Sequence, residues 1–249
     1  INMKLFYFRK KPTYGQHDNE KLNYYQCSSP KINIQNELQD NLKVDICVIG
    51  GGLTGISSAL YLAKKGYKVA VLEARKIGWG ASGRNGGQLG GGLRKEQKIL
   101  EKKVGTNRAL DLWKMGLEAV EEVKNNIKKF QIDCDLINGV LTAGYYKDDG
   151  KYFQDEIEYM NKNYNYSDYK FLNQSEINQE INSNQYYSGM LNTGSYHMHP
   201  LKYLHGIAKE VIKMNVKIYE NSAIKRIEET KDGMKAFTET NSIESNYVV

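Results

Sequence analysis

The sequence predicts an α/β fold built on a parallel sheet, and three observations between residues 44 and 73 predict it. Residues 44–49 are an apolar run rich in β-branched side chains, typical of a strand that a parallel sheet buries on both faces. Apolar residues then recur at helical spacing at Ile56, Ala59, Leu60 and Ala63. Gly66 stands where a helix is expected to end, and a second apolar run occupies 68–72. This order predicts a βαβ unit, because two parallel strands need a crossover connection.

The turn between the first strand and the helix carries the spacing G-x-G-x-x-G, at Gly50, Gly52 and Gly55. The first glycine permits a tight turn, the second lets a diphosphate approach the backbone, and the third allows close packing of helix on strand. Leu53 and Thr54 open the helix, whose free N–H groups and positive dipole end attract the phosphates. Glu73 lies 21 residues after Gly52, where an acid accepts ribose hydroxyls and repels the 2′-phosphate of NADP. We therefore predict a dinucleotide site rather than a chance glycine-rich turn.

The loop after the second strand reads Gly-Trp-Gly-Ala-Ser-Gly-Arg-Asn-Gly-Gly-Gln over residues 78–88. Its small residues let the backbone press against a cofactor, Ser82 can donate to a phosphate, and Arg84 can offset phosphate charge. Gly86 and Gly87 leave room for a planar ring. The alternative is a glycine-rich surface loop, which its position directly after the ribose acid disfavours.

This loop resembles the signature of the D-amino-acid oxidase-like (DAO) FAD-dependent oxidoreductases, and more narrowly their γ-glutamylputrescine oxidoreductase branch. The resemblance implies a Rossmann-like FAD-binding domain in which the loop runs along the FAD diphosphate and ends under the isoalloxazine ring. The backbone at Ile224 would contact the adenine edge. The implied cofactor-binding residues are Gly50, Gly52, Leu53, Thr54, Gly55, Glu73, Ala74, Arg75, Trp79, Gly80, Ala81, Ser82, Arg84, Asn85, Gly86, Gly87, Gln88 and Ile224. No His or Cys occurs in 79–88, so we expect non-covalent FAD at this loop.

The rest of the chain supplies further elements. Residues 1–40, with Pro12 and Pro30, show no clear periodicity and are interpreted as an irregular arm on the flavin domain. Apolar spacing predicts helices over 93–104 and 107–130, with Trp113 as a core anchor. Further predicted elements are strands within 134–146 with breaks at Gly139 and Gly144, a turn at 148–150, helices over 152–163 and 175–181 with Ser175 as N-cap, and a strand over 186–191.

The resemblance implies three domain assignments: an arm (1–40), an FAD-binding domain (41–135 and 196–249) and, inserted in it, the first part of an α+β substrate domain (136–195). Pro200 fits the first turn of a helix that runs to about residue 214, and a strand follows at 216–219. Residues 233–240 and 242–249 are predicted as a hairpin and a strand that returns to the flavin sheet. Family members continue well past residue 249, so the chain is expected to match their N-terminal part and to leave the substrate domain incomplete.

His197 and His199 are the catalytic candidates, as bases for amine deprotonation. The alternative, which we favour, is that they cap the helix start or pack at the domain junction. The resemblance implies oxidation of a primary or secondary amine or an amino acid, γ-glutamylputrescine-like, by hydride transfer to the flavin. The imine would hydrolyse to an aldehyde or keto product, and O₂ or another acceptor would take the electrons. A truncated FAD-binding remnant without catalysis and an NAD-linked dehydrogenase are the alternatives.

Composition limits the remaining function classes. The 249 residues suit one large or two modest domains. The net charge is +6, but Lys and Glu are interspersed, which indicates a solvated surface rather than nucleic-acid binding. Mean hydropathy is −0.63 and no apolar stretch approaches the roughly 20 residues that span a bilayer. Cys27, Cys47 and Cys134 show no C-x-x-C or metal-binding spacing, so we expect a cytoplasmic protein without a metal site, with Cys47 in the core.

Overall fold

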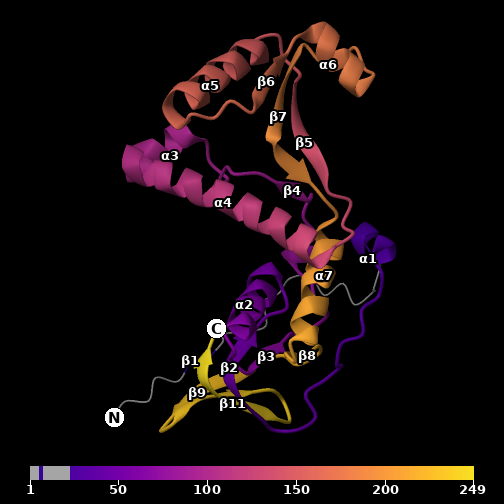
Figure 1. Ribbon diagram of the computed structural model, residues 1–249, viewed down its shortest axis with the longest axis vertical. Helices are drawn as coiled ribbons and strands as arrows, with labels where there is room; N and C mark the ends of the chain where they lie inside the picture. The colour runs from indigo at the N-terminus through magenta and orange to yellow at the C-terminus, as the bar shows by residue number, and fades with distance from the viewer. Residues whose placement is uncertain (1–5, 8–22) are drawn as a thin grey trace. The chain divides into compact units, whose positions relative to one another are not determined.

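The computed structural model describes residues 6–7 and 23–249, which form two compact units (Figure 1). The first unit comprises the described residues up to Asn85 together with Lys129–Cys134 and His199–Val249, and the second comprises Gly86–Lys128 and Asp135–Met198. We predicted that residues 86–128 belong to the FAD-binding domain. In the structure they pack within the second unit instead. The assignment of functions to the two units stays a prediction.

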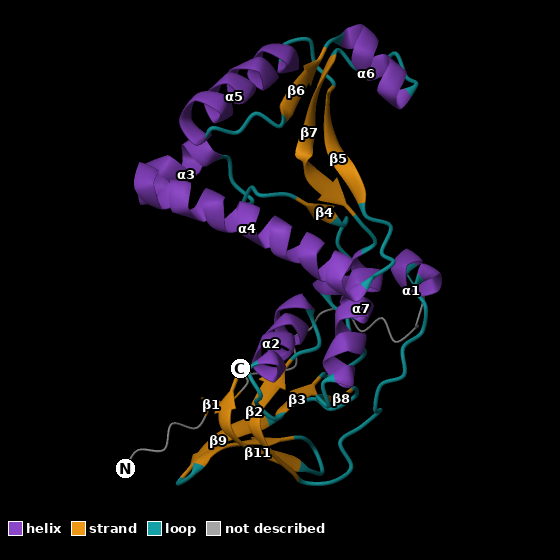
Figure 2. Ribbon diagram, in the orientation of Figure 1, coloured by secondary structure: helices purple, strands orange, loops and turns teal. Residues whose placement is uncertain are grey.

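A sheet dominated by parallel pairing at its centre organises the first unit (Figure 2). Its strand order is β1 (Phe6–Tyr7), β9 (Arg226–Thr230), β10 (Gly233–Phe237), β11 (Ser242–Val248), β2 (Leu42–Ile49), β3 (Val69–Leu72) and β8 (Lys217–Tyr219). The strands β11, β2, β3 and β8 run parallel, whereas β1, β9 and β10 pair antiparallel. The predicted βαβ unit is confirmed, and so is the return of the last strand to this sheet, since β11 pairs with β2.

Two helices lie side by side above these strands in Figure 2 and pack on each other: α2 (Leu53–Lys64) and α7 (Pro200–Lys213). Helix α2 buries Ile56 and Leu60, as its helical spacing predicts. It ends before Gly66, whose φ of +87° is the left-handed conformation expected of a residue just past a helix. Pro200 occupies the first turn of α7, which confirms the predicted helix start.

The arm is only partly irregular. Residues 1–5 and 8–22, which include Pro12, lie outside the described residues, whereas 23–40 pack on the first unit. Helix α1 (Tyr24–Ser28) contradicts the prediction of an irregular arm. It buries none of its residues, so it leaves no apolar periodicity, and a reciprocal capping box between Asn23 and Gln26 supports it instead. Leu38 enters the core cluster beside Cys47, which is fully buried as predicted.

The second unit has a separate antiparallel sheet. Its strands are β4 (Gln88–Leu89), β5 (Ile137–Gly144), β6 (Tyr169–Leu172) and β7 (Ser188–His197), and β7 pairs with each of the other three. Strand β6 was not predicted, and β7 runs beyond the predicted end at residue 191. At Gly139, with a φ of +98°, the register between β5 and β7 shifts, so the predicted break is a bulge within one strand.

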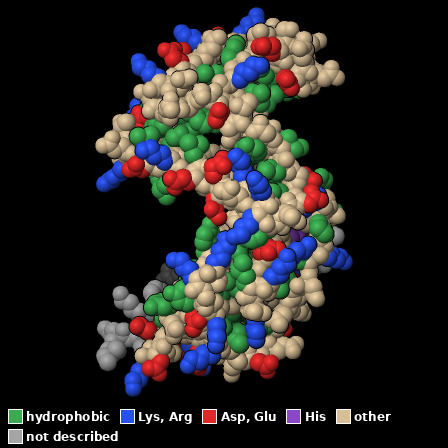
Figure 3. Space-filling view, in the orientation of Figure 1, with side chains coloured by type: hydrophobic (Ala, Val, Ile, Leu, Met, Phe, Trp, Pro, Cys, Tyr) green, Lys and Arg blue, Asp and Glu red, His purple; other side chains and the backbone are tan. Residues whose placement is uncertain are grey.

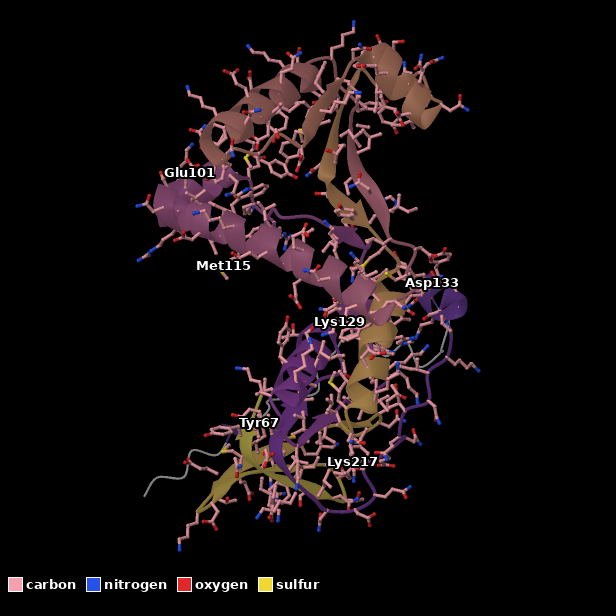
Figure 4. The ribbon with its side chains drawn as sticks, in the orientation of Figure 1. Tyr67, Glu101, Met115, Lys129, Asp133 and Lys217 are labelled. Carbon is pink, nitrogen blue, oxygen red and sulfur yellow. The ribbon has the colours of Figure 1, made fainter. Side chains whose placement is uncertain are left out.

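Helices of the second unit are α3 (Gln97–Val104), α4 (Thr106–Phe130), α5 (Asp149–Tyr164) and α6 (Gln174–Ile181). Trp113 is a core anchor as predicted, packed with Met160 and Tyr164. Glu101, labelled in Figure 4, accepts hydrogen bonds from the hydroxyls of Tyr159 at 2.6 Å and Tyr164 at 2.5 Å, which ties α3 to α5.

Two local predictions in this unit are wrong. The predicted turn at 148–150 is already the start of α5. The N-cap of α6 is Asn173 rather than Ser175, because the Asn173 amide oxygen accepts from the N–H groups of Ser175 and Glu176. The Glu176 carboxylate accepts in return from the Asn173 N–H at 2.8 Å, which completes a capping box.

Acidic and basic side chains are interspersed on the face that Figure 3 shows. Within 6–7 and 23–249, no helix combines the length and the apolar character that crossing a membrane requires.

Candidate functional site

The three motif glycines meet different physical requirements at the end of β2. Gly50 has a φ of +109°, a conformation that favours glycine, and its N–H donates to the Leu72 carbonyl at 2.9 Å. A Cβ on Gly55 would lie 2.0 Å from the Gly50 carbonyl oxygen, so this glycine is required by packing. Gly52 has an ordinary φ of −86°, yet a Cβ there would lie 2.9 Å from the Ser82 hydroxyl oxygen. The second glycine therefore keeps open the space in front of Ser82.

Backbone donors gather at the N-terminus of α2. The Leu53 N–H donates to the Ser82 hydroxyl oxygen at 3.0 Å, which leaves the Ser82 proton available for another acceptor. The N–H groups of Gly52, Thr54 and Gly55 donate to no atom of the described residues. Free N–H groups at a helix N-terminus, together with the helix dipole, favour an anion. The predicted diphosphate donors are thus brought together in the first unit.

Glu73 follows β3 and reaches the glycine turn. Its carboxylate accepts from the Gly51 N–H at 2.6 Å through one oxygen and from the Arg75 N–H at 2.8 Å through the other. Each carboxylate oxygen has a second lone pair, so both can still accept a hydroxyl. The predicted ribose acid and the predicted diphosphate turn therefore lie next to each other.

The loop at 78–85 is fixed against the same turn. The Gly78 N–H donates to the Gly51 carbonyl at 3.1 Å, and a 3₁₀ turn, Ala81–Gly83, presents Ser82. The Asn85 side chain donates to the carbonyls of Ala81 and Ser82 at 3.1 and 3.0 Å. These contacts fix the loop against the glycine turn, so Ser82 is held opposite the N-terminus of α2.

Two guanidinium groups lie over the Trp79 ring. Arg75 lies 3.7 Å and Arg84 4.4 Å from the centre of the indole ring, as cation–π pairs. Both arginines are exposed, and neither forms an ion pair with the part of the chain that the structure describes. Stacking orients the two charges without neutralising them, so they remain available for phosphate.

The segment before β9 lies beside the residues that follow β3. The Ser222 N–H donates to the Glu73 carbonyl at 2.8 Å, and the Asn221 N–H to the Arg75 carbonyl at 2.9 Å, with Ala74 exposed between them. Ile224 follows two residues later, half-buried against the core. The backbone at Ile224 thus follows directly on a segment that is hydrogen-bonded to Glu73.

The last predicted cofactor residues, Gly86, Gly87 and Gln88, belong to the second unit. The Gly87 carbonyl accepts from the Met198 N–H at 3.0 Å, and Gln88 of β4 lies opposite His197 of β7 in the sheet register. Gln88 and His197 both line a cavity of about 270 Å³ within this unit. Glu180 of α6 also lines it, and no motif in the sequence pointed to that residue.

The two candidate histidines have different environments. His199 is buried and caps α7: its Nδ1 accepts from the Lys202 N–H at 3.1 Å, and its Nε2 lies 3.0 Å from the Ser28 hydroxyl. The capping alternative is therefore confirmed for His199. His197 is exposed, and its Nδ1 lies 3.0 Å from the Gly139 carbonyl oxygen. Since a carbonyl only accepts, this bond assigns the proton of the neutral ring to Nδ1 and leaves Nε2 as an acceptor.

His205 was not predicted to have a role. Its Nδ1 lies 3.0 Å from the Ser29 hydroxyl and 3.3 Å from the Pro30 carbonyl oxygen, so it ties α7 to the arm. Burial lowers the pKa of this imidazole. Across the described ranges, no three His, Cys, Asp or Glu side chains lie close enough to hold a metal ion.

Comparison with known proteins places this geometry in context. A family model described as FAD dependent oxidoreductase (DAO) matches residues 45–249. The γ-glutamylputrescine oxidoreductase of Escherichia coli K12 is 34% identical over 226 residues, which cover 91% of this chain and 53% of that protein. A probable oxidoreductase, OrdL, of Haemophilus influenzae is 35% identical over 208 residues, 82% of this chain and 48% of that protein. The chain thus spans about half the length of these curated relatives.

Solved structures show the same fold. An L-amino acid deaminase from Proteus myxofaciens superposes with a TM-score of 0.70 at 18% identity, over 89% of this chain and 48% of that one. A glycine oxidase from Geobacillus kaustophilus gives a TM-score of 0.66 at 16% identity, over 83% of this chain and 54% of that one. These likenesses confirm the mixed α/β architecture, with its parallel-dominated sheet and separate antiparallel sheet.

Proposed function

This chain belongs to the DAO family of FAD-dependent oxidoreductases, and we propose that it binds FAD with the diphosphate at the N-terminus of α2. One observation carries this proposal: at the N-terminus of α2 the Ser82 hydroxyl lies where a Cβ on Gly52 would meet it at 2.9 Å, next to the free N–H groups of the first turn, those of Thr54 and Gly55. Arg84 supplies positive charge beside it. A doubly charged diphosphate satisfies these donors without displacing a protein group.

The adenosine half of FAD would bind next to the same glycine turn. The Glu73 carboxylate accepts the ribose hydroxyls, because each of its oxygens keeps a lone pair besides its bond to the backbone. The backbone at Ile224 meets the adenine edge. Gly86, Gly87 and Gln88 would lie along the isoalloxazine ring, and the absence of His and Cys from 79–88 makes the attachment at this loop non-covalent.

We further propose amine oxidation, with a γ-glutamylputrescine-like amine as the substrate. When bound, FAD supplies the acceptor for a hydride from the carbon that carries the amine. The chain's part is to bring the amine to the neutral state, since an ammonium group has no lone pair to assist hydride loss. His197 is suited to take that proton, because its Nε2 is an acceptor and its ring lines the same cavity as Gln88. Water then hydrolyses the imine product to a carbonyl compound, and O₂ or another acceptor takes the electrons.

The test is a flavin titration of the purified 249-residue chain, followed by anaerobic addition of γ-glutamylputrescine. We expect FAD fluorescence to be quenched at one equivalent and the oxidised-flavin absorbance to be lost on addition of the amine. Bound FAD that the amine does not reduce would indicate FAD binding without turnover. Binding of NAD in preference to FAD would contradict the proposal.

A further inference from the structure

We propose that Glu220, which follows β8, is a positioning residue of the FAD site: its carboxylate holds the main chain at Ile77 and so keeps Glu73 in place for the ribose. This inference rests on the proposed function, because Glu73 binds a ribose only if a dinucleotide occupies the glycine turn. It adds to the site a residue that acts through another side chain rather than on the cofactor.

The Glu220 carboxylate is buried and has two partners. One oxygen accepts from the Ile77 N–H at 2.8 Å, and the other accepts from the Lys76 ammonium group at 2.8 Å. The Glu220 side chain is 12% exposed, whereas the Lys76 side chain is 56% exposed. Because more than half of the lysine is in water, the ion pair contributes little. The bond to the N–H of the buried Ile77 is therefore the contact that matters, since an unpaired buried N–H is costly.

The loop that carries the ribose acid is fixed at alternate residues by the segment after β8. The Ser222 N–H donates to the Glu73 carbonyl at 2.8 Å. The Asn221 N–H donates to the Arg75 carbonyl at 2.9 Å. The third contact, two residues further along the loop, comes from the Glu220 side chain rather than from a main-chain group. Of these three contacts, it is the one that replacing a side chain removes.

The contact at Ile77 bears on the orientation of the Glu73 carboxylate. One carboxylate oxygen accepts from the Arg75 N–H at 2.8 Å, within the same loop. The other accepts from the Gly51 N–H at 2.6 Å, and the Gly51 carbonyl in turn accepts from the Gly78 N–H at 3.1 Å. Both bonds therefore depend on the course of the loop on either side of Ile77. If this N–H loses its acceptor, the loop must move to pair it with water, and the Glu73 carboxylate loses part of its orientation.

The main chain of residues 220–222 is held from its other side by the arm. The Glu220 N–H donates to the Gln35 carbonyl at 3.0 Å. The Ser222 hydroxyl donates to the Glu220 carbonyl at 2.9 Å and accepts from the Leu38 N–H at 3.0 Å. These bonds do not use the Glu220 side chain, so replacing that side chain should free the loop and leave the segment after β8 in place.

The experiment compares three variants with the wild type by FAD fluorescence quenching. Glu220→Leu removes the acceptor, Glu220→Gln keeps an amide oxygen for the Ile77 N–H, and Lys76→Met removes only the exposed ion pair. We expect Glu220→Leu to bind FAD about fivefold more weakly, the effect of one hydrogen bond, and the other two variants to stay within about twofold of the wild type. In the FAD-free chain, hydrogen–deuterium exchange of residues 73–78 should be faster in Glu220→Leu and unchanged in Lys76→Met.

A double-mutant cycle with Glu73→Ala separates positioning from a general loss of stability. If Glu220 acts through Glu73, Glu220→Leu should weaken FAD binding by less than about twofold once residue 73 is alanine.

Four results would overturn the inference while FAD binding by the wild type stands: additive losses in the cycle, equal losses in Glu220→Gln and Glu220→Leu, unchanged affinity or exchange in Glu220→Leu, or failure of Glu220→Leu to fold in a thermal unfolding scan. If the wild type itself binds no FAD, the proposed function fails and the inference falls with it.

Discussion

Replacing Gly52 by valine tests the cofactor site most directly. The Gly52 backbone, with φ −86° and ψ −178°, lies in a region that any residue adopts, and a β-branched residue favours it. The fold should therefore survive the substitution, with a loss of about 1 kcal/mol of helix-capping stability because valine is a poor N-cap. Within 4 Å the new Cβ meets only Ser82, whose hydroxyl oxygen lies 2.9 Å away.

The expected loss of FAD affinity follows from the donors that the side chain displaces. Ser82 must turn away, which removes its bond to a phosphate, and the branched methyl groups cover at least one N–H of α2. A hydrogen bond to a charged group contributes about 1.5–3 kcal/mol, so two such bonds amount to roughly 3 kcal/mol or more. This corresponds to a decrease in FAD affinity of about 150-fold or more.

The assay is FAD fluorescence quenching together with thermal unfolding followed by circular dichroism. Gly55→Ala is the contrasting variant: its Cβ would lie 2.0 Å from the Gly50 carbonyl oxygen, so it should lower the melting temperature strongly. Gly92→Ala is the neutral control, because its Cβ would meet Trp113 at an ordinary 3.6 Å. A folded Gly52→Val protein that keeps one equivalent of FAD would refute the placement of the diphosphate.

Three further predictions concern other contacts. Glu73→Ala should weaken FAD binding about tenfold without unfolding the protein, as measured by flavin titration. An unchanged affinity would show that Glu73 is not part of the FAD site. Asn173→Ala should lower the free energy of unfolding by about 1 kcal/mol in a urea titration, whereas equal losses in Ser175→Ala would contradict the cap assignment. Because burial lowers the pKa of His205, the unfolded chain takes up a proton near pH 6.5 that the folded chain does not. Stability should therefore fall as the pH drops from 7 to 5, by at most about 1.4 kcal/mol per pH unit from this group, and less steeply in His205→Gln.

The elements with strong periodicity or fixed chemistry could be predicted from the sequence. Strands β2 and β3 are continuous apolar runs, and α2 repeats its buried residues every three or four positions. The start of α7 was predictable because a proline suits few other positions in a helix. Elements held by side-chain caps were harder to predict. Helix α1 buries nothing, and the start of α6 depended on whether the asparagine or the serine two residues later accepts the N–H groups.

The candidate site also contains residues that the sequence could predict and residues that it could not. The glycine turn, Glu73 and Ser82 could be predicted because each meets a local requirement that the chain order reveals. His197 was a candidate from the sequence, but its meeting with Glu180 could not be predicted, because Glu180 reaches the same cavity only through the packing of α6 on β7. A single sequence carries no signal for such a contact.

Some glycines of the motif and the loop are required by the fold itself, whereas others are not. Gly78 has a φ of +71° and a Cβ there would lie 2.5 Å from Leu201, while a Cβ on Gly83 would lie 2.2 Å from the Gly78 carbonyl oxygen. The protein needs these two glycines whether or not a ligand binds. A Cβ on Gly80, by contrast, would meet nothing within 4 Å, and its φ of −78° suits any residue. At Gly52 a Cβ would meet only the Ser82 side chain, at 2.9 Å, and at Gly80 neither conformation nor packing requires glycine. The FAD that we propose, lying against the chain at these two positions, would give both glycines a common role.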